Sequence, residues 1–519
     1  MKTLRSYVCG DWYEATEDFV TLVDPSTEEE VAQASSTGVD FEAVVRHANE
    51  KGGPALRSML FEERAALLKA MSKTLRTHRD ELLDLSRQNN GTTVPDGSFD
   101  IDGATGTLAY YAGLGKMTGR RVVLPEGDGV QLAKTEAFWT QQVTGPRRGV
   151  AVAVNAFNFP VWGFAEKAAC ALLAGMPMIV KPATSTALAA ERAIQVLIEA
   201  DILPEGALQM VCGRTGNLLD LLGPQDVFAF TGSADTARAL RQRDSFMRTN
   251  TRVNVEADSL NAAVLGPDVE EGSTTWKLFI KDVAREIHQK TGQKCTAVRR
   301  VIVPAERQEA VIAALSARLD RVVTGNPAEE GVTMGPLANA SQLRDAEEGV
   351  AALLAEAQLV YGTGKRVDGV GSPEGKGYFF APALLVANEG AGLVHEREVF
   401  APVATLLTYQ GAAPDAGELV ARGGGTLVTS VYTDDFNWLG ELIPIVGAYT
   451  GRLYLGSAES SEAAPGSGVA MPQSLHGGPG RAGGGEELGG MTGVKLYMQR
   501  IAVQGSRAWV ERLTGTGGG

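Results

Sequence analysis

Cys295 is the residue of this sequence best placed to act as a nucleophile. It lies in a loop that contains Gly292, between a helix expected over residues 276–290 and a β-type run at residues 300–303. Such a loop often presents a reactive group on a rigid scaffold. A buried structural thiol is the competing interpretation, because cysteine is among the most buried residue types. The loop therefore predicts thiol chemistry only if other residues support it.

Two other polar residues have side chains that could assist a thiol. Glu256 closes the apolar run at residues 252–255, where a carboxylate facing a second domain would be partly desolvated. Desolvation raises the pKa of a carboxylate and suits a general base near neutral pH; a surface or salt-bridged carboxylate is the alternative. Asn158 lies between two aromatic residues and before Pro160. Its amide could donate to an oxyanion, although an asparagine that forms a turn fits the same pattern.

Residues suited to a nucleotide follow two of the expected strands. Lys181 ends an apolar strand, and ligands of α/β sheets bind at the carboxyl ends of strands. It could bind a ribose or a phosphate, or simply be solvated. Gly232 and Ser233 join a strand to a helix, where free N–H groups and the helix dipole favour a diphosphate. Turn glycines are common, and the first βα turn has no GxGxxG motif, so this signal alone is weak.

The composition indicates a globular protein of two or three domains. The chain has 519 residues, of which 44% are hydrophobic and 21% charged. A formal net charge of −14 argues against nucleic acid or an anionic membrane as the main partner. Four widely spaced cysteines and five histidines without metal-ligand spacing predict a reduced, cytoplasmic protein with no metal site. Neither a signal peptide nor a membrane span is expected.

The order of the expected elements indicates an α/β fold. The first 40 residues predict a small β arm, followed by helices at residues 41–50, 61–89 and 101–115. From residue 149 to 255, apolar strands alternate with helices, which is typical of a doubly wound domain. A second βα series runs from about residue 261 to 455.

Two segments outside these series are expected to form an oligomer contact. Residues 122–143 predict extended structure with a turn at residues 127–129, and residues 494–503 predict a late strand without a partner nearby. Residues 465–490, rich in glycine and proline, are expected to form a loop.

Six motifs resemble, in identity and order, those of the NAD(P)-dependent aldehyde dehydrogenase superfamily. They are Asn158-Phe159-Pro160, Val180-Lys181-Pro182-Ala183, Phe230-Thr231-Gly232-Ser233, Glu256, Gly292-Gln293-Lys294-Cys295 and Glu398-Val399-Phe400-Ala401-Pro402-Val403. The resemblance covers about residues 8–503, and six ordered motifs are specific where one alone is not.

The resemblance implies the aldehyde dehydrogenase fold and its division into parts. The implied parts are a Rossmann-like cofactor domain (residues 1–121 and 144–257), an α/β catalytic domain (258–455), a β oligomerisation arm (122–143 and 491–508), a Gly-rich loop near the active site (456–490) and a flexible tail (509–519).

The resemblance also implies the role of each motif residue. Cys295 would attack the aldehyde, and Asn158 with the Cys295 N–H would hold the oxyanion. Glu256 would then activate water to hydrolyse the thioester. An acylating enzyme, in which CoA resolves the thioester, generally lacks this carboxylate. The presence of Cys295, Glu256 and Asn158 together disfavours a catalytically silent relative. The residues implied to bind the cofactor are Lys181, Thr184, Gly232, Ser233, Phe157, Glu398 and Phe400.

Departures from the family pattern bear on the cofactor. Ala257 and Asp258 stand where the family usually has two glycines, and Ala237 replaces a later glycine. Many NAD-preferring members have a glutamate at the position of Thr184, whose carboxylate would repel a 2′-phosphate. Thr184 together with Lys181 therefore predicts NADP, with NAD possible.

The run at residues 256–261, with the glycine-rich run at residues 476–485, is similar to a narrower branch of the family. Members act on ring-opened CoA-thioester semialdehydes in bacterial aromatic degradation, including that of benzoate. Some carry a further hydratase-like domain, and this chain resembles those without one. The resemblance implies a small-molecule aldehyde, a CoA thioester, as substrate, in a homodimer or homotetramer; a broad-range aldehyde oxidiser is the alternative.

Three residues are expected to line the substrate site. Phe159 belongs to the first motif. Gly163 stands where relatives often carry a bulky side chain, so the tunnel would be wide. His476 stands where relatives often have an aromatic residue and would contact the acyl chain, unless it is a plain loop histidine.

Overall fold

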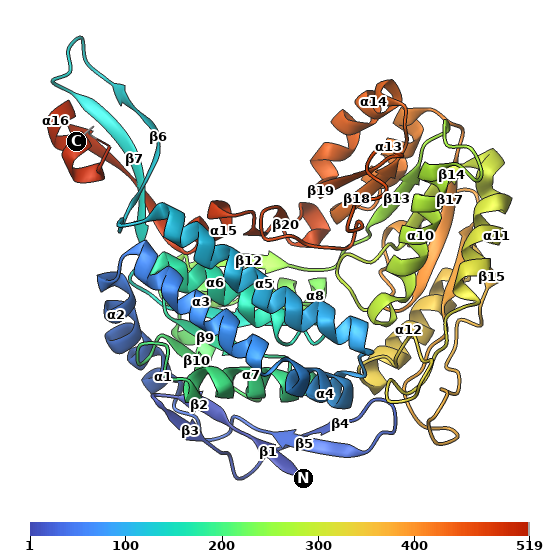
Figure 1. Cartoon of the computed structure of the whole chain (residues 1–519), viewed down its shortest axis with the longest axis horizontal. Coiled ribbons are helices and arrows are strands. Elements are labelled where there is room, and N and C mark those ends of the chain that lie inside the picture. Colours follow the sequence, from blue (N-terminus) through green and yellow to red (C-terminus); the bar gives the residue numbers. More distant parts are fainter. Residues whose placement is uncertain (517–519) are drawn as a thin grey trace.

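The computed structural model of the chain describes residues 1–516 and consists of two α/β halves with a projecting β arm (Figure 1). The first half is built on a seven-stranded sheet that uses only residues before 257. Its strands, in spatial order, are β12 (Arg252–Glu256), β11 (Val227–Thr231), β8 (Ala151–Val154), β9 (Met178–Lys181), β10 (Leu208–Met210), β2 (Ser6–Val8) and β3 (Asp11–Tyr13). The five strands from β12 to β10 are parallel, and β2 and β3 extend the sheet antiparallel.

Alternate residues of these strands pack on opposite faces of the sheet. Ala151 and Ala153 face one helical layer, while Val150 and Val152 face the other. The first layer contains α3 (Phe61–Thr77), α5 (Val94–Thr118), α6 (Trp162–Ala174) and α7 (Ala187–Glu199), with α4 (Arg79–Asn90) beside it. The second layer contains α1 (Phe41–His47), α8 (Ala234–Arg241) and α9 (Asp244–Thr249). Because both faces are covered, the central strands are apolar throughout, as the sequence predicted.

The second half is built on another seven-stranded sheet, in which all strands but β15 are parallel. Its strands, in spatial order, are β15 (Ala357–Tyr361), β16 (Ala383–Ala387), β17 (Val403–Tyr409), β14 (Arg300–Pro304), β13 (Ala262–Leu265), β18 (Thr426–Tyr432) and β19 (Thr450–Gly456). One face packs against α10 (Thr274–His288) and α11 (Gln308–Leu319), and the other against α12 (Ala340–Leu353), α13 (Ala413–Ala421) and α14 (Phe436–Val446).

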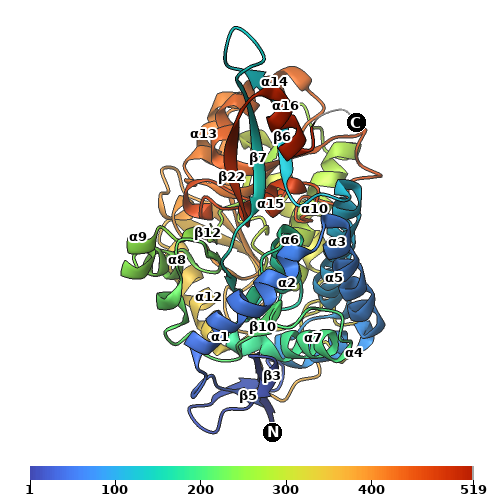
Figure 2. The ribbon, with the colours of Figure 1, turned by 90° about the vertical axis from the view of Figure 1, so that its left-hand side faces the viewer.

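The projecting arm is a three-stranded antiparallel sheet of β22 (Met498–Gly505), β7 (Trp139–Pro146) and β6 (Leu124–Gln131), visible at the top of Figure 2. The late strand and the hairpin therefore pair, from Met498 opposite Pro146 to Gly505 opposite Trp139. The smaller elements are β1 (Lys2–Leu4), β4 (Val20–Val23), β5 (Glu30–Ala34), α2 (Gly53–Ser58), β20 (Leu475–Gly477), β21 (Glu486–Leu488), α15 (Met491–Leu496) and α16 (Arg507–Thr514).

Two predicted helices have different bounds in the structure. The single helix predicted over residues 61–89 is wrong, because the backbone of His78 leaves the helical region and separates α3 from α4. The helix predicted from residue 101 begins at Val94 instead. The Thr93 side chain caps it by accepting from the N–H of Asp96, and a proline in the first turn suits a helix start.

Three further predictions are corrected. The turn predicted at residues 127–129 is an irregularity within β6, and the chain reverses between Gln131 and Trp139. The loop predicted at residues 465–490 contains the short strand pair β20 and β21. Residues 509–514 of the predicted flexible tail belong to α16, which buries Val510, whereas residues 517–519 lie outside the described residues. Among residues 1–516, we find no helix with the length and apolarity needed to span a bilayer.

Candidate active site

Asn158, Glu256 and Cys295 meet at one buried pocket. Asn158 follows β8, Glu256 ends β12, and Cys295 lies between α10 and β14. These residues line the pocket together with Ala156, Phe159, Trp162, Gly163, Glu166, Thr231 and His476. The carboxyl end of the first sheet, where Asn158 and Glu256 lie, therefore faces the amino end of the second sheet, where Cys295 precedes β14. Folding thus brings together three residues that are up to 137 positions apart in the sequence.

The Cys295 loop has a backbone that only a few residues can adopt. Lys290 and Thr291 have left-handed φ angles of 52° and 55°, and Gly292 follows at 66°. A Cβ atom at Gly292 would lie 2.2 Å from the carbonyl oxygen of Ala401. The loop therefore requires glycine at this position for both its conformation and its packing.

Buried donors fix the carbonyl groups of the loop. Arg299 Nη2 donates to the carbonyls of Gly292 (2.9 Å) and Lys294 (3.3 Å), and Asn261 Nδ2 donates to that of Cys295 (2.7 Å). Asn158 Nδ2 donates to the carbonyl of Gln293 (3.0 Å). Because an amide has two N–H groups, Asn158 keeps a second donor for an oxyanion at Cys295.

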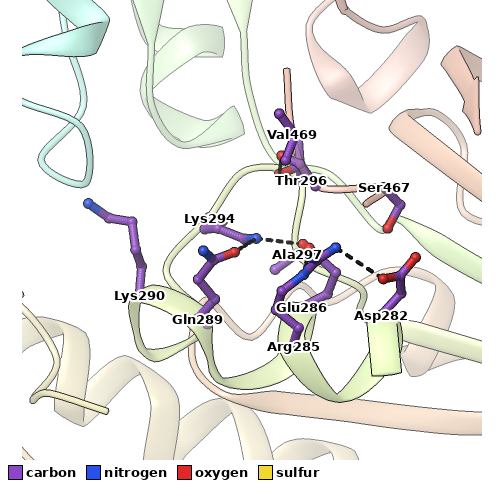
Figure 3. A network of polar contacts seen from close by, with 12 residues as sticks. Asp282, Arg285, Glu286, Gln289, Lys290, Lys294, Thr296, Ala297, Ser467 and Val469 are labelled. Carbon is purple, nitrogen blue, oxygen red and sulfur yellow. Dashed lines mark hydrogen bonds and ion pairs between the residues drawn. The ribbon is translucent and has the colours of Figure 1, made fainter. Parts of the chain in front are cut away.

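A charged network lies beneath the same loop (Figure 3). Lys294 Nζ forms an ion pair with Glu286 Oε2 at 2.6 Å and donates to Gln289 Oε1 at 2.7 Å. Lys290 points away from this pair, and its Nζ lies 4.2 Å from the centre of the Phe159 ring. Lys294 directly precedes Cys295, so the pair with Glu286 anchors the backbone of the Cys295 loop.

His476 contacts both Glu256 and Cys295, which the sequence did not indicate. Its Nε2 atom is 3.2 Å from Glu256 Oε2 and 3.7 Å from Cys295 Sγ, and its ring stacks on Trp162. A carboxylate oxygen of Glu256, the sulfur of Cys295 and a ring nitrogen of His476 all lie within 4.8 Å of one another, as the ligands of a metal ion would. We interpret this cluster as an acid–base site rather than a metal site, because the carboxylate and the imidazole already balance each other's charge.

The pairing with His476 reverses the expected pKa shift of Glu256. Burial alone would raise the pKa of this carboxyl, but His476, together with the Lys167 charge and a hydrogen bond from Cys295, outweighs burial and lowers the pKa to about 2. The prediction of a raised pKa was therefore wrong, because the sequence did not reveal the partner. Burial would lower the pKa of His476, yet the Glu256 carboxylate raises it well above its usual value. Burial and the Glu256 charge raise the pKa of the Cys295 thiol to about 12, while His476 opposes this shift.

A second charged group borders Glu256. Lys167 Nζ donates to Glu166 Oε1 at 2.7 Å and to Glu487 Oε2 at 3.0 Å, and Asn254 Nδ2 donates to Glu487 Oε1 at 3.0 Å. Burial raises the pKa of Glu166 to about 7, with Lys167 opposing the shift. None of these charged neighbours of Glu256 was predicted from the sequence. The one available signal was the Glu166-Lys167 pair inside an otherwise apolar helix, since charged residues are rarely buried unless paired.

The residues predicted to bind the adenosine ribose lie together at the end of β9. Lys181 Nζ donates to Thr184 Oγ1 at 3.4 Å, and Thr184 Oγ1 donates to the carbonyl of Gly213 at 3.1 Å. Burial lowers the pKa of Lys181. An ammonium group with so weak a partner is suited to an incoming ribose or phosphate oxygen.

The start of α8 holds an anionic side chain of the protein itself. Ser233 caps the helix by accepting from the N–H of Thr236, and Gly232 precedes it. The N–H of Ala234, however, donates to Asp258 Oδ1 at 2.7 Å. A diphosphate at this helix start would share its donors with the Asp258 carboxylate.

Three other residues predicted to bind the cofactor also lie close together. The Phe157 and Phe400 rings pack edge to face with centroids 5.8 Å apart. Glu398 accepts from Arg299 Nε and from the Ser259 N–H, both at 3.2 Å, and burial raises its pKa to about 7. In this arrangement Glu398 is engaged by protein donors.

Buried polar atoms without hydrogen-bond partners at the carboxyl edge of the first sheet bear on whether a nucleotide fits there. Asn155 follows β8 and Thr231 ends β11, at the carboxyl edge of the first sheet. Both amide atoms of Asn155 and the Thr231 hydroxyl are buried and have no hydrogen-bond partner within residues 1–516. Because buried polar groups are normally paired, these atoms fit a polar ligand such as NAD(P) at this edge of the sheet.

Comparison with known proteins identifies the family. The model of the aldehyde dehydrogenase family matches residues 12–498, which include every residue of the candidate site described above. The chain belongs to the aldehyde dehydrogenase family.

Individual relatives agree with this assignment. The chain is 44% identical over 478 residues to a 3,4-dehydroadipyl-CoA semialdehyde dehydrogenase of Aromatoleum evansii, covering 92% of this chain and 93% of the relative. Its fold matches lactaldehyde dehydrogenase from Escherichia coli with a TM-score of 0.83 at 23% identity, over 97% of this chain and 99% of the other. It also matches betaine aldehyde dehydrogenase from Staphylococcus aureus, determined with NAD+, with a TM-score of 0.82 at 20% identity, over 98% of both chains. The predicted aldehyde dehydrogenase fold is thus confirmed.

Proposed function

We propose that this aldehyde dehydrogenase converts a CoA-thioester semialdehyde to the carboxylic acid by a hydrolytic route, with NADP as the preferred cofactor. The observation that carries the proposal is the convergence of Cys295, Glu256 and Asn158 on one pocket. A thiol, a carboxylate and an amide donor are the groups needed for nucleophilic attack, water activation and oxyanion binding.

Cys295 and Asn158 perform the first half of the reaction. The Cys295 sulfur bonds to the aldehyde carbon, and the electron pair of the C=O bond moves to oxygen. The free N–H of the Asn158 amide and the Cys295 N–H stabilise this oxyanion. When NAD(P) is bound, it supplies the hydride acceptor that makes the net conversion an oxidation, and Cys295 is left as a thioester.

Glu256 performs the second half by taking a proton from water. The resulting hydroxide attacks the thioester carbon, the C–S bond breaks, and the acid leaves while the electron pair returns to Cys295. Glu256 must leave its ion pair with His476 to act as a base, because the pairing lowers its pKa to about 2. Carboxylate oxygens of Glu256, Glu166 and Glu487 lie within 4.8 Å of one another, so one bridging water would carry the proton from Glu256 to these groups afterwards.

The residues at the end of β9 support the preference for NADP. Thr184 places a neutral hydroxyl beside the Lys181 ammonium, and no carboxylate from either position opposes a 2′-phosphate. The residues that would hold the cofactor are Lys181, Thr184, Gly232, Ser233, Phe157, Glu398 and Phe400.

The substrate assignment rests on the relative from Aromatoleum evansii, and we propose 3,4-dehydroadipyl-CoA semialdehyde, oxidised in aerobic benzoate degradation. Gly163 supports a wide entrance, since a Cβ there would meet only Asn155, at 3.8 Å. Phe159 and His476 line the same pocket. A broad-range oxidation of other semialdehydes is the second candidate, because the residues that line the pocket include no lysine or arginine to bind the CoA phosphates. The working unit would be a homodimer or homotetramer joined through the projecting arm, whose Phe138 and Ile501 side chains are exposed.

Steady-state kinetics test the substrate and the cofactor together. Reduced-cofactor formation is compared between 3,4-dehydroadipyl-CoA semialdehyde and the corresponding free acid, with NADP and with NAD. We expect a higher kcat/KM for the thioester and for NADP. Equal values for both aldehydes would leave the family activity intact but refute the CoA assignment.

A further inference from the structure

His476 has an environment that packing alone does not explain. It lies on β20, is buried, and stacks on Trp162 with ring centroids 6.3 Å apart. An apolar aromatic side chain would fill this position equally well. An imidazole costs more to bury, unless its nitrogen atoms find partners.

The partner of His476 is the base of the reaction, and a third atom shares the same nitrogen. Nε2 faces Glu256 Oε2 at 3.2 Å and Cys295 Sγ at 3.7 Å, so a single N–H lies between the carboxylate and the thiol. A histidine that served only to satisfy a buried carboxylate would have no reason to contact the nucleophile.

The charges that surround His476 favour its protonated form. Glu256 faces it from β12, and Cys295 from the loop after α10. On α6, Glu166 adds a second carboxylate and Lys167 an ammonium group, and Glu487 lies opposite His476 in the β20–β21 pair. The groups on these four elements comprise three carboxylates, one ammonium and one thiol, so the net field at the ring is negative.

We propose that His476 is a catalytic residue of this enzyme: its imidazolium stabilises the thiolate of Cys295, both when the sulfur attacks the aldehyde and when it leaves the thioester. The proposal rests on the thiohemiacetal mechanism given above. The pKa of His476, raised by Glu256, agrees with a ring that stays charged.

The proton movements balance in both halves of the cycle. In the attack, the S–H bond of Cys295 breaks, its proton passes to Glu256, and the electron pair on sulfur forms the S–C bond while the imidazolium faces the sulfur. Glu256 then releases this proton and later takes one from water. When the C–S bond breaks, its electron pair returns to sulfur beside the imidazolium, and the proton that Glu256 took from water passes to Cys295. His476 itself transfers no proton in these steps and is neither consumed nor oxidised.

Alkylation of Cys295 by iodoacetamide tests the proposal without substrate or cofactor, because the thiolate is the reactive form. Rates are measured between pH 6 and pH 10, chosen as about two units either side of pH 8, with the label located on Cys295 by mass spectrometry. His476→Phe keeps an aromatic ring without charge, and His476→Gln keeps an N–H donor without charge. His78→Phe, at a half-exposed histidine that pairs with Glu81 away from the site, is the control. Circular dichroism and thermal unfolding establish that each variant is folded.

Both site variants should slow alkylation at pH 8 about tenfold, equivalent to one pKa unit at the thiol, whereas His78→Phe should match the parent. In a Glu256→Gln background the effect of His476→Phe should largely disappear, because the ring loses the carboxylate that keeps it charged. Parent-like rates in His476→Gln would overturn the charge argument, and so would an equal loss in both Glu256 backgrounds. Because this assay involves no turnover, it separates failure of this proposal from failure of the proposed function.

Discussion

The Lys294 ammonium lies 2.6 Å from the Glu286 carboxylate, and the next residue along the chain is Cys295, the proposed nucleophile. Both side chains of the pair are buried almost completely. A buried ion pair contributes little net stability, but loss of one partner leaves an uncompensated charge. The pair therefore fixes the conformation of the Cys295 loop and makes it sensitive to single substitutions.

Glu286→Gln should destabilise the enzyme by about 3–5 kcal/mol, because the Lys294 charge stays buried without its partner. Denaturant unfolding measures this change. The double variant Glu286→Leu with Lys294→Met should recover much of the loss, and the exposed Glu309→Gln on α11 is the matched control. If Glu286→Gln unfolds at the same denaturant concentration as the parent, the pair does not anchor the loop.

Gly292→Ala should lower kcat strongly, because the new Cβ would lie 2.2 Å from the Ala401 carbonyl. Gly331→Ala is the matched control, since Gly331 also has a positive φ but a Cβ there meets no atom within 4 Å in the described chain. The control should cost only the backbone strain of about 1–2 kcal/mol and retain its activity. Equal losses of kcat in the two variants would show that packing of the Cys295 loop is not the cause.

Asp258→Asn should lower the KM for the cofactor severalfold. The Asp258 carboxylate accepts from the N–H of Ala234 at the start of α8, where a diphosphate would bring further negative charge. The amide keeps the size of the side chain and removes the repulsion. Initial rates at varied NADP test this, with Asp235→Asn, exposed on the same helix, as the control. A raised KM would indicate that Asp258 supports cofactor binding instead.

Thr184→Glu should raise the KM for NADP by at least about tenfold and affect the KM for NAD much less, since a carboxylate near Lys181 would repel only the 2′-phosphate. The neutral Thr184→Gln controls for side-chain size. A parallel loss with both cofactors in the glutamate variant would refute the proposed basis of the NADP preference.

His395 should make the folded state less stable in acid. Burial, and then the charge of Arg300 at 3.1 Å, lower its pKa to about 3. Below the ordinary histidine pKa the unfolded chain binds a proton that the folded chain excludes, so stability falls as pH drops from about 6.5 towards 3. His395→Gln, which can still accept from Arg300, should reduce this slope. Denaturant midpoints at several pH values measure how steeply stability depends on pH, with His78→Gln, at a half-exposed histidine, as the reference. An unchanged slope in His395→Gln would contradict the lowered pKa of His395.

Much of the fold was predictable from local patterns. The apolar strands around Val152 and Val180 and the helix ahead of Cys295 carry their periodicity in a few consecutive residues. The break at His78 was not predictable, because the apolar stripe of the helices continues across it. The bulge at Gly127 and the strand pair around His476 depend on partners distant in the sequence.

The candidate site was predictable as a set of residues but not as an electrostatic unit. Lys181 and Glu256 are the last residues of strands, so the sequence could place them at an edge of a sheet. The charge state of each depends on neighbours that folding brings in. His476 is 220 positions from Glu256, and their pairing reversed the expected pKa shift of the base. Local sequence carries no record of such a contact.

Trapping of the thioester in Glu256→Gln tests the central claim most directly. The variant is mixed with NADP and excess aldehyde, and reduced cofactor and protein mass are followed together. We expect one equivalent of reduced cofactor per active site, formed more slowly than in the parent because Glu256 no longer takes the thiol proton. Little turnover should follow, with the acyl group attached to Cys295. Sustained turnover with no adduct on Cys295 would contradict the assignment of Cys295 as nucleophile and Glu256 as the base for hydrolysis.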